Sequence, residues 1–319
     1  MTRASRARAI ASAAAVGGAG LVGAGGAVYG LLLGQSRLAR RRIGEPQEEP
    51  LDADGLYGNG DAPIRLVVLG DSGAAGFGVE HPEQTTGAVI ARELAGATDR
   101  PVQLRTYAQV GAQSGDLQAQ IDLIESPWPD LAVIAVGAND VTHRVTPGRS
   151  VALLSAAIGR LREHDVAVVV GTCPDLGTVR PIPHPLKWVA RRWSRSLAAA
   201  QTVAAVAAGA RSVALADLLG AEFAAHPDTM FGPDQFHPSP AGYRAFAEAL
   251  VPSLVEALTE PAPRLVDAGS RELARVAAEA AEVAGAEVSA EQGSRARRLL
   301  RLRRPTPPAS DPAASQPLP

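Results

Sequence analysis

The sequence predicts a three-layer α/β/α sandwich built on a five-stranded parallel sheet. Short β-branched and apolar runs alternate with longer segments of helical spacing between residues 64 and 258. The runs lack a polar face, which is typical of strands that helices cover on both sides. The spacings between runs and helices are short, as expected for parallel strands joined by crossover helices.

Five strands and five helices are expected in this order along the chain. The predicted strands are Ile64–Leu69, Val102–Tyr107, Leu131–Val136, Val166–Val170 and Val213–Ala216. The predicted helices are Thr85–Ala97, Gly115–Glu125, Arg149–His164, Lys187–Ala208 and Pro240–Leu258. A loop-rich stretch is expected between the fifth strand and the last helix.

Residues 1–43 are predicted to form a retained membrane anchor. The run from Ala9 to Gly34 has no charged residue, and arginines flank both of its ends. About 20 apolar residues suffice to cross a bilayer, whereas a cleaved signal peptide has a shorter apolar core. We therefore expect a single-pass cell-membrane protein, with secretion after signal cleavage as the alternative. Because both flanks are basic, the membrane face stays open.

Small residues in the anchor and basic residues in the tail suggest further contacts. Gly26, Gly30 and Gly34 lie four residues apart, which allows close helix packing and self-association. Residues 44–63 are predicted as a linker, 64–260 as the α/β domain, and 261–319 as a helical and then disordered tail. The segment Arg295–Arg304 holds six arginines and three leucines. It suits either a solvated tail or a segment lying on anionic lipid.

Composition excludes several classes of function. The chain has a net charge of −2, so bulk attraction to nucleic acid is not expected. Cys173 is its only cysteine. An internal disulfide and a thiolate zinc cluster are therefore excluded.

Polar residues gather where four of the predicted strands end. Ligands of parallel α/β sheets bind outside the carboxyl ends of the strands, so these positions are the first place to look for a site. The four blocks are GDSGAAG at Gly70–Gly76, VGAQSGDL at Val110–Leu117, GAND at Gly137–Asp140 and DQFHPS at Asp234–Ser239.

Together these blocks contain the groups that acyl transfer needs. A serine such as Ser72 becomes nucleophilic when an imidazole, here His237, takes its proton. Asp234 lies three residues before His237, so one local turn can place its carboxylate against the imidazole and orient it. The oxyanion needs aimed donors, and the backbone N–H groups of Ser72 and Gly111 with the Asn139 amide would supply them.

These four blocks resemble the motifs of the SGNH, or GDSL-type, hydrolases over about residues 64–258. The resemblance implies a flavodoxin-like fold and esterase or lipase activity on lipid acyl or O-acetyl esters. It also implies that Ser72 is the nucleophile, His237 the base, Asp234 its acid, and that Gly111 and Asn139 are oxyanion donors. Two features depart from the pattern: Gly73 stands where the motif has leucine, and Gly115 competes with Gly111.

Other interpretations of the same residues stay open. Ser72 alone suits a helix cap, Asn139 a turn, and His143 is a rival base. Trp188 and Trp193 are expected to pack in the core. Asp71, Asn139, Asp140, Asp234 and His237 could instead be ligands of a metal-dependent phosphoesterase, and a non-catalytic binding module is a further alternative. The favoured hypothesis is a serine esterase that needs no metal and no organic cofactor.

Overall fold

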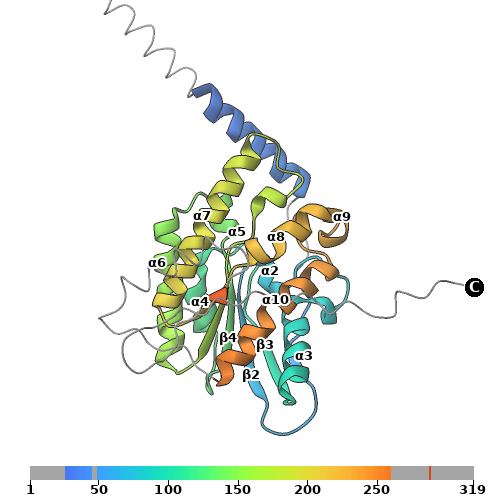
Figure 1. The fold of residues 1–319 in the computed structure, drawn as a ribbon, viewed down its shortest axis with the longest axis vertical. Helices are drawn as coiled ribbons and strands as arrows, with labels where there is room; N and C mark the ends of the chain where they lie inside the picture. Colours follow the sequence, from blue (N-terminus) through green and yellow to red (C-terminus); the bar gives the residue numbers. More distant parts are fainter. Residues whose placement is uncertain (1–25, 45–48, 260–286, 289–319) are drawn as a thin grey trace, which may run out of the picture.

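The computed structural model describes residues 26–44, 49–259 and 287–288 of the 319-residue chain. Its seven-stranded sheet has the order β1-β3-β2-β4-β5-β6-β7 (Figure 1). The strands are β1 Gly55–Tyr57, β2 Ile64–Gly70, β3 Val102–Thr106, β4 Leu131–Ala135, β5 Ala167–Gly171, β6 Arg211–Val213 and β7 Glu287–Val288.

The five central strands are parallel, as predicted, but the sheet is not purely parallel. At one edge β1 pairs antiparallel with β3, and at the other β7 pairs antiparallel with β6. The prediction of five strands is therefore wrong at both edges. The two edge strands have three and two residues, too few to show a periodic pattern in the sequence. The segment predicted as a linker, residues 44–63, contains β1.

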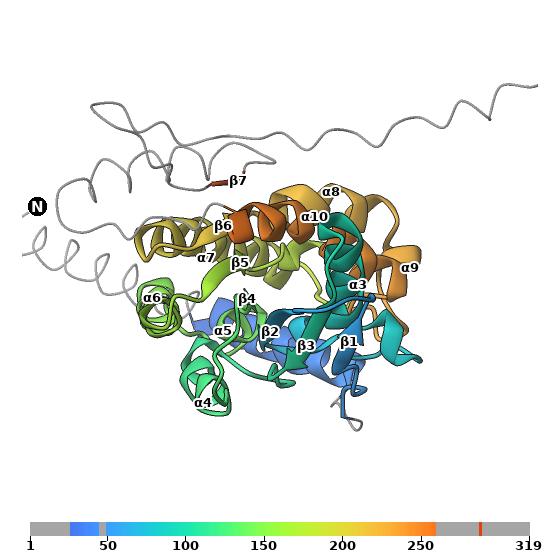
Figure 2. The same cartoon turned by 90° about the horizontal axis from the view of Figure 1, so that it is seen from below.

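Helices cover both faces of the sheet. They are α2 Ser72–Ala75, α3 Thr86–Thr98, α4 Leu117–Asp122, α5 Ala138–Thr142, α6 Pro147–Glu163, α7 Leu186–Ala207, α8 Leu215–Ala225, α9 Pro227–Met230 and α10 Pro240–Thr259. Figure 2 shows α3 and α10 on one side of the sheet and α4 and α6 on the other.

Alternate side chains of the strands build two separate cores. In β2, Ile64, Leu66 and Val68 pack with α3 and α10, whereas Val67 and Leu69 pack with α4 and α6. Successive side chains of a strand point to opposite faces, so an apolar residue at every position requires a cover on both sides. The three predicted layers are thus confirmed.

The segment between the fifth strand and α10 differs from the prediction. The strand β6 begins at Arg211 and ends at Val213, and α8 and α9 occupy most of the stretch expected to be loop-rich. Arg211 is buried in the strand and its guanidinium binds the Glu256 carboxylate at 2.9 Å. Because the strand begins with the charged Arg211, the apolar pattern predicted it two residues too late, at Val213–Ala216.

Residues 26–43 form a helix that packs against the domain near the first turn of α7 (Figure 1). Ala39 of this helix is buried, and the Gln35 side chain accepts a hydrogen bond from the Leu186 backbone N–H at 3.0 Å. Within the described part of the chain, none of the helices combines the length and apolar character needed to cross a bilayer. Of the predicted anchor, residues 1–25 lie outside that part, as do most of residues 261–319.

Candidate active site

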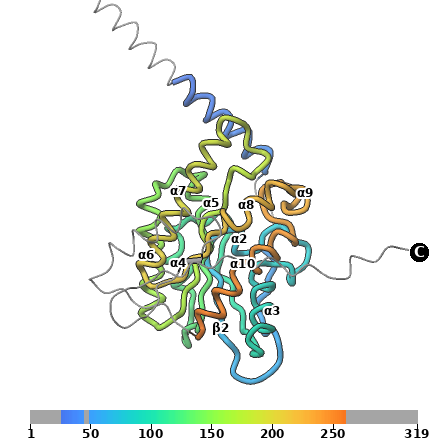
Figure 3. The backbone as a smooth tube through the Cα atoms, in the orientation of Figure 1, coloured from blue at the N-terminus to red at the C-terminus, as the bar shows by residue number. Residues whose placement is uncertain are grey.

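The turn that carries Ser72 depends on a glycine at the end of β2. Gly70 has φ +134°, and a Cβ there would lie 1.8 Å from the Ala135 carbonyl oxygen of β4. Only glycine therefore fits where the two strands meet. The tube in Figure 3 shows the chain passing from β2 to α2 at the end of the sheet where α5 and α8 also lie.

The short helix α2 is held at both ends. The Asp71 carboxylate accepts a hydrogen bond from the Gly73 backbone N–H at 3.0 Å, which caps the helix at its start. Gly76, with φ +71°, ends the helix, and a Cβ there would lie 2.6 Å from atoms of Thr85. Gly70 thus lets the chain turn from β2 into α2, and Gly76 lets it leave α2 after a single helical turn.

Ser72, His237 and Asp234 form one chain of hydrogen-bonding groups. His237 Nε2 lies 2.9 Å from Ser72 Oγ, and His237 Nδ1 lies 2.6 Å from Asp234 Oδ2. Ser72 and His237 are both buried. The structure therefore brings Ser72 against a pair of residues that follows it in the sequence by more than 160 positions.

A tight loop between α9 and α10 sets the geometry of Asp234 and His237. The Gly232 N–H donates to the His237 carbonyl at 2.8 Å and closes this loop. Asp234 Oδ1 accepts the backbone N–H groups of Phe236 and His237, each at 2.9 Å. One carboxylate oxygen thus holds the loop and leaves the other for the imidazole.

The two aspartates near the serine differ in their pKa. Burial raises the pKa of Asp234, but the hydrogen bonds from His237 and the Phe236 N–H outweigh it, so the net pKa is lowered. Asp71 is more deeply buried, and this burial raises its pKa to about 6 despite the hydrogen bond from Gly73. Asp234 is therefore the carboxylate suited to stay ionised beside a histidine.

The predicted oxyanion donors Gly111 and Asn139 lie on neighbouring segments. The Asn139 side-chain amide donates to the Ala112 carbonyl at 3.1 Å, which fixes it beside the loop that holds Gly111. Gly111 has φ +84°, whereas Gly115, the rival, lies in a short 3₁₀ turn, Ser114–Asp116.

Asp140 connects the same two segments from within the protein. Its carboxylate accepts the Ser114 backbone N–H at 3.1 Å and the Ser114 hydroxyl at 3.2 Å. The side chain is fully buried, so Asp140 is a structural contact between these segments and not a surface residue. The sequence around Asp140 and Ser114 has no pattern from which their contact could be predicted.

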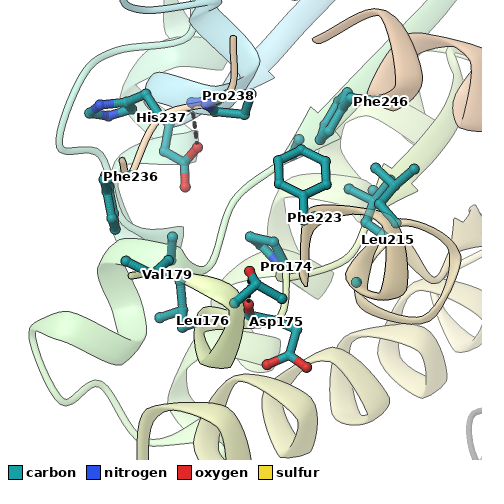
Figure 4. A pocket seen from close by; sticks show the side chains of 18 of the residues that line it. Pro174, Asp175, Leu176, Val179, Leu215, Phe223, Phe236, His237, Pro238 and Phe246 are labelled. Atoms are coloured by element: carbon teal, nitrogen blue, oxygen red, sulfur yellow. Dashed lines mark hydrogen bonds between the residues drawn. The ribbon is translucent and has the colours of Figure 1, made fainter. Parts of the chain in front are cut away.

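A cavity of about 100 Å³ opens beside Ser72 and His237. Most of its walls are apolar, and Figure 4 shows Phe223, Leu215 and Phe246 on one side with Leu176 and Val179 on the other. Leu215, Leu219 and Phe223 come from α8, whose first two residues were predicted to end the fifth strand and whose remainder was predicted to be loop-rich. Their spacing of four residues is a helical signal that could have identified this wall.

The remaining candidates lie elsewhere. His143 is exposed, and its Nδ1 lies 2.9 Å from the Asn139 carbonyl oxygen. Trp193 packs in an apolar cluster as expected, but the expectation is wrong for Trp188, which is 67% exposed. Cys173 is buried, and this burial raises its thiol pKa. Among the described residues no three His, Cys, Asp or Glu side chains are grouped to hold a metal ion.

Known proteins resemble this chain in sequence and in fold. Residues 68–245 match the profile of the GDSL-like lipase/acylhydrolase family. The GDSL-like esterase Rv1075c of Mycobacterium tuberculosis is 40% identical over 266 residues, which cover 78% of this chain and 85% of that protein.

Two solved structures are similar at 19% identity. LAE5, an alpha/beta hydrolase enzyme from the metagenome of Lake Arreo, matches 61% of this chain and 96% of its own, with a TM-score of 0.50. A lipase/acylhydrolase from Enterococcus faecalis matches 62% and 98%, with a TM-score of 0.49. The family profile and the mycobacterial relative lead to one conclusion: this chain belongs to the GDSL-like lipase/acylhydrolase family and is an ester hydrolase.

Proposed function

We propose that this chain hydrolyses carboxylic esters through an acyl-enzyme on Ser72, with His237 as the base and Asp234 as its orienting acid. The observation that carries the proposal is the pair of contacts at His237, 2.9 Å to Ser72 Oγ and 2.6 Å to Asp234 Oδ2. Both are within the reach that proton transfer between positioned groups requires.

The reaction runs in two halves. Ser72 Oγ attacks the ester carbonyl carbon while His237 Nε2 takes the hydroxyl proton. The tetrahedral intermediate collapses, the alcohol leaves with that proton, and the acyl group stays on Ser72. Water then attacks the acyl-enzyme, with His237 again taking and returning a proton. Asp234 keeps the Nδ1 proton in place and stabilises the imidazolium.

The oxyanion is stabilised by three donors in this proposal. They are the backbone N–H groups of Ser72 and Gly111 and the side-chain amide of Asn139. The Ser72 N–H lies at the start of α2, where backbone N–H groups have no partner within the helix. The hydrogen bond from Asn139 to the Ala112 carbonyl leaves its second amide hydrogen to donate, because each side-chain amide has two.

The substrate in this account carries an apolar acyl group, of lipid acyl or O-acetyl type. The cavity beside Ser72 is enclosed by leucine, valine and phenylalanine side chains, which favour a hydrocarbon over a charged group. The mycobacterial relative is described as an esterase, which agrees with this class of reaction.

We also propose that the chain is held at the cell membrane by a single span. Support comes from the uncharged run from Ala9 to Gly34 with arginines on both flanks. Secretion after cleavage remains the alternative. The same proposal has two further parts. One is contact of anionic lipid with Arg295–Arg304, and the other is self-association through Gly26, Gly30 and Gly34.

Hydrolysis of p-nitrophenyl esters by the full chain, with and without EDTA, tests this function. The account predicts turnover that EDTA does not change and that Ser72→Ala abolishes. Loss of turnover in EDTA would favour a metal-dependent phosphoesterase instead. A folded chain that hydrolyses no ester would favour a binding module.

A further inference from the structure

A second apolar cavity lies between the helix of residues 26–43 and the α/β domain. Its volume is about 230 Å³, more than twice that of the cavity beside Ser72. The helix contributes Leu32, Leu33 and Ile43 to its wall, and the domain contributes Val141, Ile182, Leu186 and Trp193. Apolar side chains from both elements thus surround a space that the packing of the chain itself does not fill.

The two cavities share part of their walls. Leu176 and Phe236 line both the cavity beside Ser72 and the cavity under the helix. The Phe236 ring contacts the catalytic candidate His237, with ring centroids 4.9 Å apart. Figure 4 shows Phe236 beside His237. Because Phe236 also lines the second cavity, that cavity begins one side chain away from the proposed reaction centre.

The helix is held over this space by polar contacts at its middle and near its C-terminal end. Gln35 accepts the Leu186 N–H at 3.0 Å and donates to the His184 carbonyl at 2.5 Å. Arg40 donates to the Thr142 carbonyl at 3.2 Å. These contacts fix the helix to the loop before α7 and to the end of α5, so the cavity has a defined roof.

We propose that this second cavity binds the distal part of a long acyl chain whose ester carbonyl lies at Ser72. The inference rests on the proposed function and extends it to the substrate class. Short acyl groups use only the smaller cavity, whereas a long chain passes Leu176 and Phe236 into the space under the helix. The uncharged run Ala9–Gly34 ends within this helix, so the segment proposed to meet lipid and the cavity are adjacent along the chain.

Two matched substitutions on the helix test the route. Ser36 lines the cavity, and Leu38 is 41% exposed on the other face of the same helix. Ser36→Phe fills the space, whereas Leu38→Phe adds the same ring outside it. Each buried methylene contributes about fourfold in affinity, so displacing two or more costs about tenfold or more.

We expect Ser36→Phe to lower the ratio of kcat/KM for p-nitrophenyl decanoate to that for the acetate by about tenfold or more. Leu38→Phe should leave this ratio within about twofold of the wild type. An unchanged ratio in Ser36→Phe would overturn the inference while acetate turnover still upheld the proposed function.

A direct mapping of the chain end provides a second test. A fluorophosphonate with a long alkyl chain and a terminal diazirine forms a P–O bond to Ser72 as fluoride leaves, and light then crosslinks the chain end. We expect crosslinks within residues 32–43 or 182–193. Crosslinks confined to α8 and α10 would overturn the inference, and the absence of phosphonate on Ser72 would overturn the proposed function with it.

Discussion

Gln120 binds both backbone groups of Gly70. Its side-chain oxygen accepts the Gly70 N–H at 2.8 Å, and its amide donates to the Gly70 carbonyl at 2.8 Å. Gln120 is fully buried on α4, and Gly70 is the last residue of β2, two positions before Ser72. A helix on one face of the sheet thus holds the end of the strand that presents the proposed nucleophile.

Gln120→Leu should destabilise the fold, because it leaves the Gly70 N–H buried with no replacement partner, whereas the Gly70 carbonyl keeps its bond from the Gln109 N–H at 3.0 Å. An unsatisfied buried group costs about 1–3 kcal/mol, so we expect the free energy of unfolding to fall by about that amount. Urea denaturation measures it. Gln118→Leu on the same helix is the matched control and should cost under about 1 kcal/mol, because Gln118 is only partly buried. Equal losses in the two variants would contradict the assignment.

The two histidines near the strand ends should differ sharply in their effect on turnover. His237→Ala removes the base and should lower kcat by about 10⁴-fold or more. His143→Ala removes an exposed side chain that contacts the Asn139 carbonyl oxygen, so kcat should stay within a few-fold of the wild type. Steady-state kinetics on p-nitrophenyl acetate separates them. The reverse ranking would show that the wrong base had been assigned.

Asn139→Ala should act on the transition state rather than on substrate binding. Loss of one oxyanion donor lowers kcat by about 10²–10³ with a smaller change in KM. The variant also loses the bond to the Ala112 carbonyl, so its free energy of unfolding is measured beside the kinetics. A rise in KM at constant kcat would mean that Asn139 binds substrate without stabilising the oxyanion.

Asp71 should make stability fall as pH rises through the range between its two pKa values. Its pKa is raised from 3.8 to about 6 by burial, so the folded chain retains a proton that the unfolded chain releases in this range. Asp71→Asn keeps an oxygen that can accept the Gly73 N–H but does not titrate. Its stability relative to the wild type should therefore rise by about 2–3 kcal/mol between pH 4 and pH 7.

Asp234 should behave in the opposite sense and serves as the comparison. Its lowered pKa contributes stability above the ordinary pKa of an aspartate, and this contribution is lost as pH falls through the folded-state value. Asp234→Asn should therefore lose stability, relative to the wild type, as pH rises.

The free energies of unfolding of both variants and the wild type are measured by urea denaturation across pH. Parallel curves for Asp71→Asn and the wild type would rule out the role of Asp71.

Patterns that lie within one strand or one turn were readable from the sequence. The strands β4 and β5 are uninterrupted apolar runs, which the two covering layers require. Ser72, Asn139 and His237 each lie within a recognisable block. Asp234 and His237 lie in one loop, so their contact needed only local geometry. The meeting of this pair with Ser72 followed from the rule that the carboxyl ends of parallel strands share one edge.

The features that could not be predicted depend on contacts between distant segments. β1 is a three-residue strand that pairs with the edge of β3, a contact between segments far apart in the sequence. Asp140 meets Ser114 because α5 packs against the 3₁₀ turn Ser114–Asp116, and neither residue has a pattern that reveals its burial. The docking of residues 26–43 onto the loop before α7 likewise depends on single side chains such as Gln35, whose contact has no periodic signal in the sequence.

The central claim is that Ser72 is an activated nucleophile, and covalent labelling tests it most directly. The full chain is treated with a fluorophosphonate, with and without EDTA, and the modified peptide is located by mass spectrometry. The account predicts one label on Ser72, at equal yield in EDTA, and none in His237→Ala over the same time. Labelling of another serine, or none on a folded chain, would contradict it.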